Sequence, residues 1–575
     1  MQTITAQLDA AFRAAIRDAF GFDADPLVAP AQTDKFGDYQ ANASMGLAKV
    51  VAERTGQKTN PRQVAEQIKA KLDLGEMASE VSIAGPGFLN VRLSPAWLSG
   101  QLAAIGSDPR LGVATVAAPL RVIVDYPSLN AAKESHVGHI RPMDIGDAIA
   151  RVLRFAGHEV IPQNHLGDWG TAFGMLLNHL QSVGGSADAE IASLDAFYKA
   201  AKRRFDEEPA FADESRAMVV KLQGGDPTAL KLWAKILDET RRHFEQIYAR
   251  MNLTVPSDAE RGESFYNPLL ADTVKELKDL GVATLSEGAT VVWVEGFEAP
   301  LIVQKTGGGF GYAATDLAAV RYRLRELKGQ WLVYVTDARQ SQHFTQWIAA
   351  ARKAGWLTSE TRIDHVTFGT ILGEDGKPLK TKSGENVKLA DVLDEAEQRA
   401  LALVSAKSGD ALSDDAKRQV ATSVGVGAVK YFDLNKDRTS DYQFNWELML
   451  SLDGNTAPYL QYAYARIQSI KRKTGLAASA ASAPITLDSP FELALAKQIL
   501  RLGEVVESVL RDLKPHVLCL YLYELAGRFS GFYENCPVLQ SDGPTRTSRL
   551  ALCDLTARTI ALGLDLLGIE HPDQM

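Results

Sequence analysis

The chain has 575 residues, 46% of them apolar and 23% charged, an ordinary composition for a folded protein of several domains. Its net charge is −9, so any nucleic-acid binding must use local basic surface rather than bulk charge. Three widely spaced cysteines, Cys519, Cys536 and Cys553, argue against a disulfide scaffold and a C-x-x-C zinc site. No apolar run reaches the ~18 residues of a membrane span, and the N-terminus lacks the pattern of a signal or transit peptide. We therefore expect a cytoplasmic protein.

The first ~115 residues mix helical and strand patterns. Within them, residues 28–42 are interpreted as a polar loop that contains Gly37-Asp-Tyr-Gln40, and residues 81–93 as a strand and a turn. The Ala-rich stretch 111–119 is expected to be a linker.

The most informative segment begins at residue 121. Residues 121–125 form a short apolar run that predicts a buried strand, residues 139–155 have helical periodicity, and residues 159–163 predict another strand. Strand, loop, helix and strand within about 40 residues predict a βαβ unit with parallel strands and a right-handed crossover.

Residues 190–250 have a strong helical pattern and are expected to form an insertion. Strand patterns resume at 290–294, 301–305 and 331–335. Helical patterns alternate with them, which favours a continuing doubly wound α/β fold. After about residue 388 the strand signals end, and the rest is expected to be helical apart from a biased loop at 477–490.

The motif His136-Val-Gly-His139 lies between the first predicted strand and its helix. Gly138 allows a ligand to approach the backbone, and a helix N-terminus attracts phosphate. Two imidazoles at this place can donate hydrogen bonds to phosphoryl oxygens. The alternative is a histidine pair that caps the helix or lies in the core. The position at the carboxyl end of a strand favours nucleotide binding.

Two further features carry positive charge. Lys133 is either a solvated loop lysine or a point charge on ATP phosphates. Residues 373–384 are rich in glycine and carry Lys377, Lys380 and Lys382. This segment is either a solvated hairpin tip or a mobile loop that brings cations to a ligand.

Tyr312 and Asp316 follow the glycine-rich turn 307–309 and share one face of a predicted helix, because they are four residues apart. Glu263 offers a second carboxylate. Two carboxylates with a tyrosine suit a cationic ligand, above all the planar fork of a guanidinium. The alternative for Thr315 and Asp316 is a helix cap, and for Glu263 a surface loop.

These residues stand in longer blocks that together resemble the class I arginyl-tRNA synthetases, most of all the bacterial form. Residues 125–141 look like the HIGH signature region of that family. Further family-like blocks are 163–171, 261–268, 312–318, 337–343, 454–459 and 529–533. The matches run from Gly37 to Met575 and are jointly highly specific.

The resemblance implies a doubly wound, Rossmann-type α/β catalytic domain between an α+β N-terminal domain and an all-α C-terminal domain. The implied parts are an elbow-binding domain at 1–115, the catalytic domain at 119–388 with a helical insertion at about 185–250, a connecting region that contacts the acceptor stem at 389–454, and an anticodon-binding domain at 455–575.

The resemblance also implies an arginine–tRNA ligase. L-arginine and ATP, which brings Mg²⁺, give arginyl adenylate and pyrophosphate, and arginine then moves to the terminal adenosine of tRNA(Arg). The implied catalytic residues are His136, His139 and Lys133. The implied ATP-binding residues are His136, Gly138, His139, Lys380 and Lys382. No resident metal site is expected.

In this family Asn130 corresponds to the asparagine that holds the amino acid backbone. Tyr312 and Asp316 correspond to residues that read the guanidinium, and Glu263 and Gln340 to others in the arginine pocket. The family generally needs bound tRNA before it activates the amino acid, and we expect a monomer.

Two departures from the family pattern concern the phosphate site. Pro127-Ser-Leu-Asn130 stands where the family often has Ser-Ser-Pro-Asn, and residues 380–384 replace the usual lysine-methionine-serine-lysine-serine loop. In such enzymes Lys133 is taken to supply the missing cation. The sequence leaves open which loop lysine contacts phosphate.

The C-terminal part interleaves basic and aromatic residues, which suits the splayed bases of a single-stranded RNA loop. The basic residues are Lys430, Lys436, Arg438, Arg466, Lys471, Arg472 and Lys473, and the aromatic ones Tyr431, Tyr459, Tyr462, Tyr464, Phe532 and Tyr533. Of these we select Tyr459, Arg466 and Tyr533 as tRNA-binding. The alternative is a helical core with solvated lysines, to which we assign about half of the aromatics.

Two other functions are retained as alternatives: a different H-x-G-H nucleotidylyltransferase, and a catalytically silent paralogue that only binds tRNA. The first need not carry the Tyr312 and Asp316 pair or the long helical tail. The second is disfavoured by five intact residues of the implied site: His136, His139, Lys133, Asn130 and Asp316. ATP–pyrophosphate exchange with each amino acid, with and without tRNA, separates all three functions.

Overall fold

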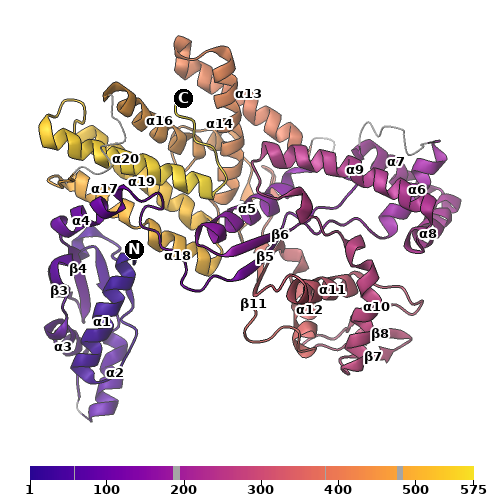
Figure 1. The fold of residues 1–575 in the computed structure, drawn as a ribbon, viewed down its shortest axis with the longest axis horizontal. Helices are drawn as coiled ribbons and strands as arrows, with labels where there is room; N and C mark the ends of the chain where they lie inside the picture. The colour runs from indigo at the N-terminus through magenta and orange to yellow at the C-terminus, as the bar shows by residue number, and fades with distance from the viewer. Residues whose placement is uncertain (57, 185–193, 382–383, 475–483) are drawn as a thin grey trace.

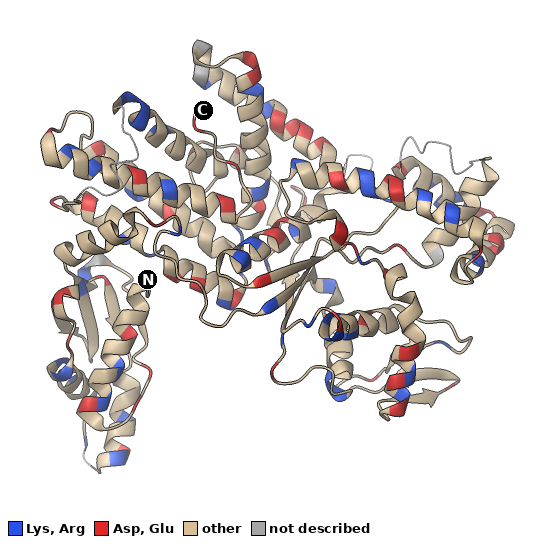
Figure 2. Ribbon diagram, viewed as in Figure 1, with Lys and Arg blue, Asp and Glu red and all other residues tan. Residues whose placement is uncertain are grey.

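The computed structural model describes residues 1–575 except 57, 185–193, 382–383 and 475–483. Figure 1 shows an elongated molecule, with the N-terminal region and the C-terminal helices at one end and the helices that follow β6 at the other. Acidic and basic residues are spread over all of these parts (Figure 2), in keeping with a modest net charge.

The N-terminal region packs helices against one antiparallel sheet of order β1-β2-β4-β3. Its strands are β1 (Val28–Pro30), β2 (Tyr39–Ala41), β3 (Ala78–Ala84) and β4 (Phe88–Leu93). Its helices are α1 (Ile4–Phe20), α2 (Ser44–Thr55), α3 (Pro61–Lys71) and α4 (Pro95–Gly106). The expected loop at 28–42 therefore contains two short strands. Gly37 between them has φ +82°, and a Cβ there would lie 2.6 Å from the Val91 carbonyl oxygen, so the close approach to β4 requires glycine.

A second sheet has four parallel strands in the order β11-β10-β5-β6. They are β5 (Arg121–Asp125), β6 (Glu159–Gln163), β10 (Trp331–Asp337) and β11 (Arg362–Phe368). The predicted βαβ unit is confirmed, with α5 (Ile140–Phe155) joining β5 to β6, and α12 (Ser341–Lys353) joins β10 to β11. The strand order reverses between β5 and β10, and the carboxyl ends of these two strands border the crevice where such sheets bind ligands.

The strands expected at 290–294 and 301–305 do not join this sheet. They lie in a separate antiparallel sheet of order β7-β8-β9, formed by β7 (Ala283–Ser286), β8 (Ala289–Val292) and β9 (Leu301–Gln304). Glu287 and Gly288 both have positive φ, which makes a two-residue hairpin turn and fixes the antiparallel pairing. Helices α10 (Glu263–Asp279) and α11 (Tyr312–Arg325) flank this sheet in the chain.

The helical pattern expected at 190–250 is confirmed over the described residues, where α7 (Leu194–Glu207), α8 (Pro209–Gln223) and α9 (Pro227–Arg250) lie. A further helix that was outside this expectation, α6 (Thr171–Ser182), precedes them. Residues 190–193 of that expectation lie outside the described residues. Phe173, Leu176 and Leu237 belong to a core that these helices share among themselves.

The described residues of the C-terminal part are helical, as expected, apart from one short strand. Its helices are α13 (Leu389–Ser408), α14 (Asp414–Leu434), α15 (Trp446–Met449), α16 (Ala457–Thr474), α17 (Pro490–Leu500), α18 (Leu502–Asp512), α19 (His516–Asn535) and α20 (Gly543–Leu566). The exception is β13 (Tyr442–Gln443), which pairs in parallel with β12 (Ile371–Leu372). Of the biased loop at 477–490, residues 477–483 lie outside the described residues.

The largest hydrophobic core is continuous from α1 through one face of the parallel sheet to α20. The N-terminal region also contacts the C-terminal helices through polar groups, since Tyr39 Oη donates to Glu504 at 2.8 Å and Lys497 Nζ lies 2.5 Å from Asp38. Among the described residues, no helix is long and apolar enough to cross a membrane.

Candidate active site

The His136–His139 motif lies between the carboxyl end of β5 and the start of α5, as the sequence predicts. Nδ1 of His136 accepts a hydrogen bond from the Gly138 amide at 3.1 Å, and Nδ1 of His139 accepts one from the His136 amide at 3.2 Å. The two rings stack with their centroids 3.7 Å apart. The two histidines therefore do cap the start of the helix, as the alternative interpretation proposed. These hydrogen bonds also hold both rings in place.

Capping leaves both histidines able to bind an anion. Because each ring accepts at Nδ1, we assign the proton of the neutral imidazole to Nε2. Burial, with the charge of Lys133 as a further cause, lowers the pKa of His136 and lowers the pKa of His139 to about 3. Both side chains are neutral near pH 7, and each has an Nε2–H group available as a donor.

A pocket of about 720 Å³ opens at this end of the parallel sheet. His136, Gly138 and His139 line it, together with residues that follow β5, β10 and β11. Asn130 and Gln340 also line it, so predicted ligand-binding residues from distant parts of the chain meet here.

Lys380 lines the same pocket from the glycine-rich segment after β12. That segment folds back on itself through bridges between Leu372 and Pro378 and between Lys380 and Asn386. The hairpin alternative thus describes its shape, while the lining position of Lys380 fits a role toward a ligand. Lys382 lies outside the described residues.

Lys133 lies beside the pocket without lining it. Its ammonium lies over the ring of Tyr198 on α7, 4.5 Å from the ring centroid, which is a cation–π contact. Its charge is nevertheless felt by His136 and His139, since it contributes to lowering the pKa of both.

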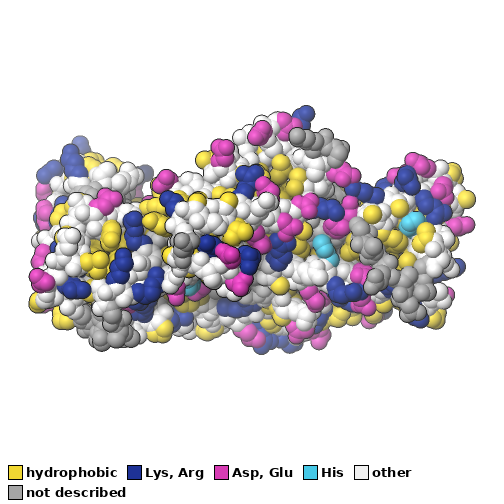
Figure 3. All heavy atoms as spheres, turned by 90° about the horizontal axis from the view of Figure 1, so that it is seen from above, with side chains coloured by type: hydrophobic (Ala, Val, Ile, Leu, Met, Phe, Trp, Pro, Cys, Tyr) yellow, Lys and Arg dark blue, Asp and Glu magenta, His cyan; other side chains and the backbone are white. Residues whose placement is uncertain are grey.

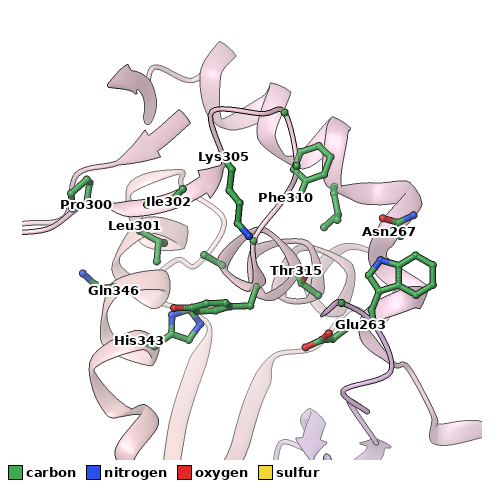
Figure 4. A pocket seen from close by; sticks show the side chains of 18 of the residues that line it. Glu263, Asn267, Pro300, Leu301, Ile302, Lys305, Phe310, Thr315, His343 and Gln346 are labelled. Atoms are coloured by element: carbon green, nitrogen blue, oxygen red, sulfur yellow. The ribbon is translucent and has the colours of Figure 1, made fainter. Parts of the chain in front are cut away.

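A second cavity of about 1010 Å³ adjoins the first, because Arg339 lines both. Residues of α10, α11, α12 and the loop after β9 surround it. Figure 4 shows Glu263 and His343 on opposite sides of this cavity, with Lys305 reaching into it from the loop. Tyr312 also lines it and is 69% exposed, so its ring is available to a ligand.

Glu263 is the first residue of α10, and Asp168 fixes this helix end. The Asp168 carboxylate accepts from the Ser264 amide at 2.9 Å and from the Ser264 hydroxyl at 2.5 Å. A Cβ on Gly262 would lie 2.4 Å from Asp168 Oδ2, which explains glycine before Glu263. Burial, followed by the charges of Asp168 and Asp316, raises the pKa of Glu263 to about 7. A cation bound beside Glu263 would favour its ionised form.

Asp316 lies one turn inside α11, whose N-cap is Gly311, so the helix-capping alternative for Asp316 is wrong. Asp316 Oδ2 lies 2.5 Å from Nε2 of His343 on α12. The His343 ring packs edge-on against Tyr312, with centroids 4.7 Å apart. His343 lines the larger cavity, whereas Asp316 lies behind it and is not among the lining residues.

The five side chains predicted to bind one amino acid are thus divided between two adjoining cavities. Glu263 and Tyr312 line the larger cavity, whereas Asn130 and Gln340 line the smaller cavity. Asp316 lines neither cavity, but its partner His343 lines the larger one.

Sequence reasoning missed the groups that support this site. Asp125 at the end of β5 forms an ion pair with Arg323 of α11, Oδ2 to Nη2 at 2.6 Å, and both are buried. A carboxylate at the end of a buried apolar strand needs a partner of opposite charge. The position of Asp125 in the sequence therefore indicates that such a partner exists, without identifying it. His343 is the last residue of the family-like block 337–343, but its sequence position alone does not indicate a contact with Asp316, and Lys305 carries no distinctive sequence signal.

The C-terminal helices carry a pocket of about 460 Å³. Arg466 and Tyr533 line it together with Tyr462, and the Arg466 guanidinium lies 5.2 Å from the centroids of both rings. Tyr459 lies outside it and contacts Tyr523. Figure 3 shows basic and hydrophobic side chains intermixed over the end of the molecule that carries these helices.

Several C-terminal residues are core rather than surface. Tyr431, Tyr464 and Phe532 are buried, in line with the share of aromatics assigned to the core. Lys430 was grouped with the tRNA-facing cations, and that interpretation is wrong: it is 1% exposed, donates to the Met251 carbonyl and lies 3.8 Å from Asp144. Lys430 lies in a basic stretch of the sequence, and nothing in that stretch indicates that its side chain is buried.

The parallel sheet, the H-x-G-H helix start and the C-terminal helical domain define a class I aminoacyl-tRNA synthetase. Three family models match: "Arginyl tRNA synthetase N terminal domain" at residues 6–93, "tRNA synthetases class I (R), catalytic domain" at 103–446, and "DALR anticodon binding domain" at 460–575. The chain belongs to the arginyl-tRNA synthetase family.

Individual relatives agree with this family. The chain is 49% identical to the arginine–tRNA ligases of Cellvibrio japonicus, over 96% of each chain, and of Chromobacterium violaceum, over 100% of each. Among solved structures it resembles arginyl-tRNA synthetase from Plasmodium falciparum, with TM-score 0.89 and 29% identity, and that from Thermus thermophilus, with 0.83 and 27%. Both structural matches cover 100% of each chain.

Proposed function

We propose that the chain joins L-arginine to tRNA(Arg) in two steps in the paired cavities of the catalytic domain. The arginine carboxylate attacks the α-phosphorus of ATP, and pyrophosphate leaves. A hydroxyl of the terminal tRNA adenosine then attacks the carbonyl of arginyl adenylate, and AMP leaves. The observation that carries this proposal is the meeting of a neutral-histidine pocket and a carboxylate cavity at Arg339.

ATP is proposed to bind in the pocket of about 720 Å³ that the two histidines line, which is the smaller of the two adjoining cavities. His136, Gly138 and His139 bind its phosphates, and the two Nε2–H groups donate to the oxygens on which charge develops in the first step. Lys380 and Lys382 add positive charge from the loop. Because both imidazoles are already neutral near pH 7, they keep their Nε2–H donors and do not change charge over the physiological range. Mg²⁺ arrives with ATP as part of that substrate.

Lys133 is proposed as the third catalytic residue. Its ammonium lies over the ring of Tyr198. Catalysis by Lys133 therefore requires its flexible side chain to leave this ring and reach a phosphate, which its position beside the pocket allows.

Arginine is proposed to span the two cavities. Asn130 and Gln340 hold its amino acid end beside ATP, while Glu263, Tyr312 and Asp316 read the guanidinium. Lysine lacks the planar fork and citrulline lacks the charge, so either one leaves the half-buried carboxylates without the full set of hydrogen bonds that a guanidinium makes. Such a site can discriminate by roughly 10⁴ or more without an editing domain.

tRNA is proposed to contact parts of the chain beyond the catalytic domain. Residues 1–115 bind the elbow, 389–454 the acceptor stem, and 455–575 the anticodon loop. Arg466 and Tyr533 offer a guanidinium and a ring on which bases stack, and Tyr459 adds a third contact.

We also propose that the enzyme acts as a monomer in the cytoplasm. Light scattering would check the oligomeric state, and cell fractionation would check the localisation.

The test is aminoacylation of tRNA(Arg) by the purified chain with ATP and each amino acid in turn. The proposal predicts charging with arginine alone. Failure to charge tRNA that the protein does bind would favour the silent paralogue, and charging with another amino acid would favour a different synthetase.

A further inference from the structure

The segment after α14 lies between the smaller pocket and the C-terminal helices. The pocket is lined in part by Phe368, Gly369, Thr370 and Ile371, which follow the carboxyl end of β11. Residues 437–443 contact this lining on one side and the turn between α18 and α19 on the other.

Arg438 makes both contacts with one guanidinium. Its Nη1 donates to the carbonyl of Thr367 at 2.7 Å, and its Nε donates to the carbonyl of Leu513 at 3.0 Å. Thr367 is the last residue but one of β11, and Leu513 is the left-handed residue that ends α18. The rigid fork of arginine suits this arrangement, because donors at fixed separation set the distance between two main-chain groups.

Main-chain contacts reinforce the link on the side of the pocket. The Gly369 amide donates to the carbonyl of Arg438 at 3.0 Å, and the Thr370 amide donates to Asp441 Oδ1 at 2.6 Å. A Cβ on Gly369 would lie 2.7 Å from the Ser440 carbonyl, so the two segments pack as closely as glycine permits.

The same segment also reaches the helix that carries the histidine motif. Arg141, two residues after His139, donates to the Ser440 carbonyl at 2.9 Å, and its Nε lies 3.0 Å from Asp433 of α14. Arg141 lines the smaller pocket and is 1% exposed. Residues 437–443 therefore contact both the lining after β11 and the start of α5.

We propose that Arg438 is a positioning residue for the ATP pocket: it sets the place of residues 368–371 by joining the end of β11 to the α18–α19 turn. This inference rests on the proposed function. Arg438 is not among the residues that line this pocket, and it is proposed to act through the Thr367 carbonyl. Displacement of a binding surface by about 1 Å costs on the order of 10²-fold in rate, so a lost tether there is measurable in catalysis.

A second arginine provides a matched control. Arg362, the first residue of β11, donates from Nη2 to the carbonyl of Arg511 in α18 at 3.1 Å. Both arginines thus connect β11 with α18: Arg362 contacts a residue within the helix, and Arg438 contacts the residue that ends it. Only Arg438 does so at the end of β11 that borders the pocket, so a role in domain docking alone predicts equal effects from both residues.

The experiment compares Arg438→Met, Arg438→Lys and Arg362→Met in the full chain. ATP–pyrophosphate exchange with arginine, in the presence of tRNA(Arg), gives KM for ATP, KM for arginine and kcat. Thermal unfolding checks that each variant is folded. Absence of exchange in the wild-type chain would refute the proposed function, whereas the inference is judged on the variants relative to an active wild type.

The inference predicts that Arg438→Met raises KM for ATP at least about tenfold and lowers kcat, with a much smaller change in KM for arginine. Arg438→Lys, which keeps the charge but loses the fork, should recover part of the loss, and Arg362→Met should stay within about twofold of wild type. If Arg438→Met does not fold, a raised KM for ATP in folded Arg438→Lys carries the test. Wild-type kinetics in every folded Arg438 variant, or equal losses in the Arg362 and Arg438 variants, would overturn it.

Discussion

Nε2 of His343 lies 2.5 Å from Oδ2 of Asp316, across the gap between α12 and α11. The imidazole therefore forms a close polar contact with the carboxylate that is proposed to bind the guanidinium. The same ring also packs against Tyr312. A histidine in this position fixes the side chain of Asp316 before arginine binds, which lowers the cost of ordering it on binding.

His343→Ala should raise KM for arginine by about tenfold or more, since a hydrogen bond to a charged group contributes about 1.5–3 kcal/mol. His343→Gln, which retains a donor at the end of the side chain, should lose less. KM for ATP should change little in both variants. Exchange kinetics measure all three values, and equal KM for arginine in the wild-type and alanine enzymes would contradict this role.

Glu263 should make arginine binding depend on pH. Burial and the neighbouring Asp168 and Asp316 charges raise its pKa to about 7, so the free enzyme holds a proton there at acidic pH. Because the guanidinium favours the ionised carboxylate, bound arginine lowers this pKa and releases the proton. Affinity for arginine should therefore rise as the pH increases from about 6 to 8.

Calorimetric titration with arginine in buffers of different ionisation enthalpy measures the released proton directly. Glu263→Gln should bind more weakly and lose most of the pH dependence between 6 and 8. An unchanged pH dependence in that variant would assign the proton to another group.

The tautomers of His136 and His139 can be tested by substitution. Glutamine places its amide nitrogen near Nε2 of histidine, whereas asparagine places it near Nδ1. Because Nδ1 of each ring accepts a backbone amide and Nε2 remains the donor, His139→Gln should retain more activity than His139→Asn. The loss in the asparagine variant should be about 10²-fold in adenylate formation, measured in a single turnover. The reverse order of activities would refute the assigned tautomer.

Lys133→Ala should slow adenylate formation with little change in tRNA affinity. Loss of one charge at a developing phosphoryl anion costs about 2–4 kcal/mol, or tens to hundreds of fold in rate. Tyr198→Leu removes the cation–π contact and serves as the matched variant, since it frees Lys133 without removing its charge. Single-turnover rates equal to wild type in the alanine variant would exclude Lys133 from the catalytic residues.

Local pattern was sufficient for the βαβ unit, because the apolar run at β5 and the helical periodicity of α5 lie within one short segment. The antiparallel β7–β9 sheet was missed for a local reason as well: Glu287-Gly288 is a hairpin turn whose signal was not recognised. Residue patterns alone left each motif with a second interpretation, and the family resemblance decided among them.

Contacts between distant segments were beyond sequence reasoning. His343 meets Asp316, Tyr198 meets Lys133, and each pair is joined only by the fold. The burial of Lys430 is of the same kind, because a lysine in a basic stretch gives no local sign of an aspartate partner on α5. Composition and spacing identify candidate groups, while packing decides which of them face a ligand.

The measurement that tests the central claim most directly is exchange kinetics of Asp316→Asn, with arginine and ATP varied separately in the presence of tRNA(Arg). Asparagine keeps the shape of the side chain and removes its charge, so it tests the reading of the guanidinium without emptying the site. The account predicts a fall in kcat/KM for arginine of at least about 10²-fold, with KM for ATP within a few fold of wild type. An unchanged response to arginine, or a loss confined to ATP, would contradict it.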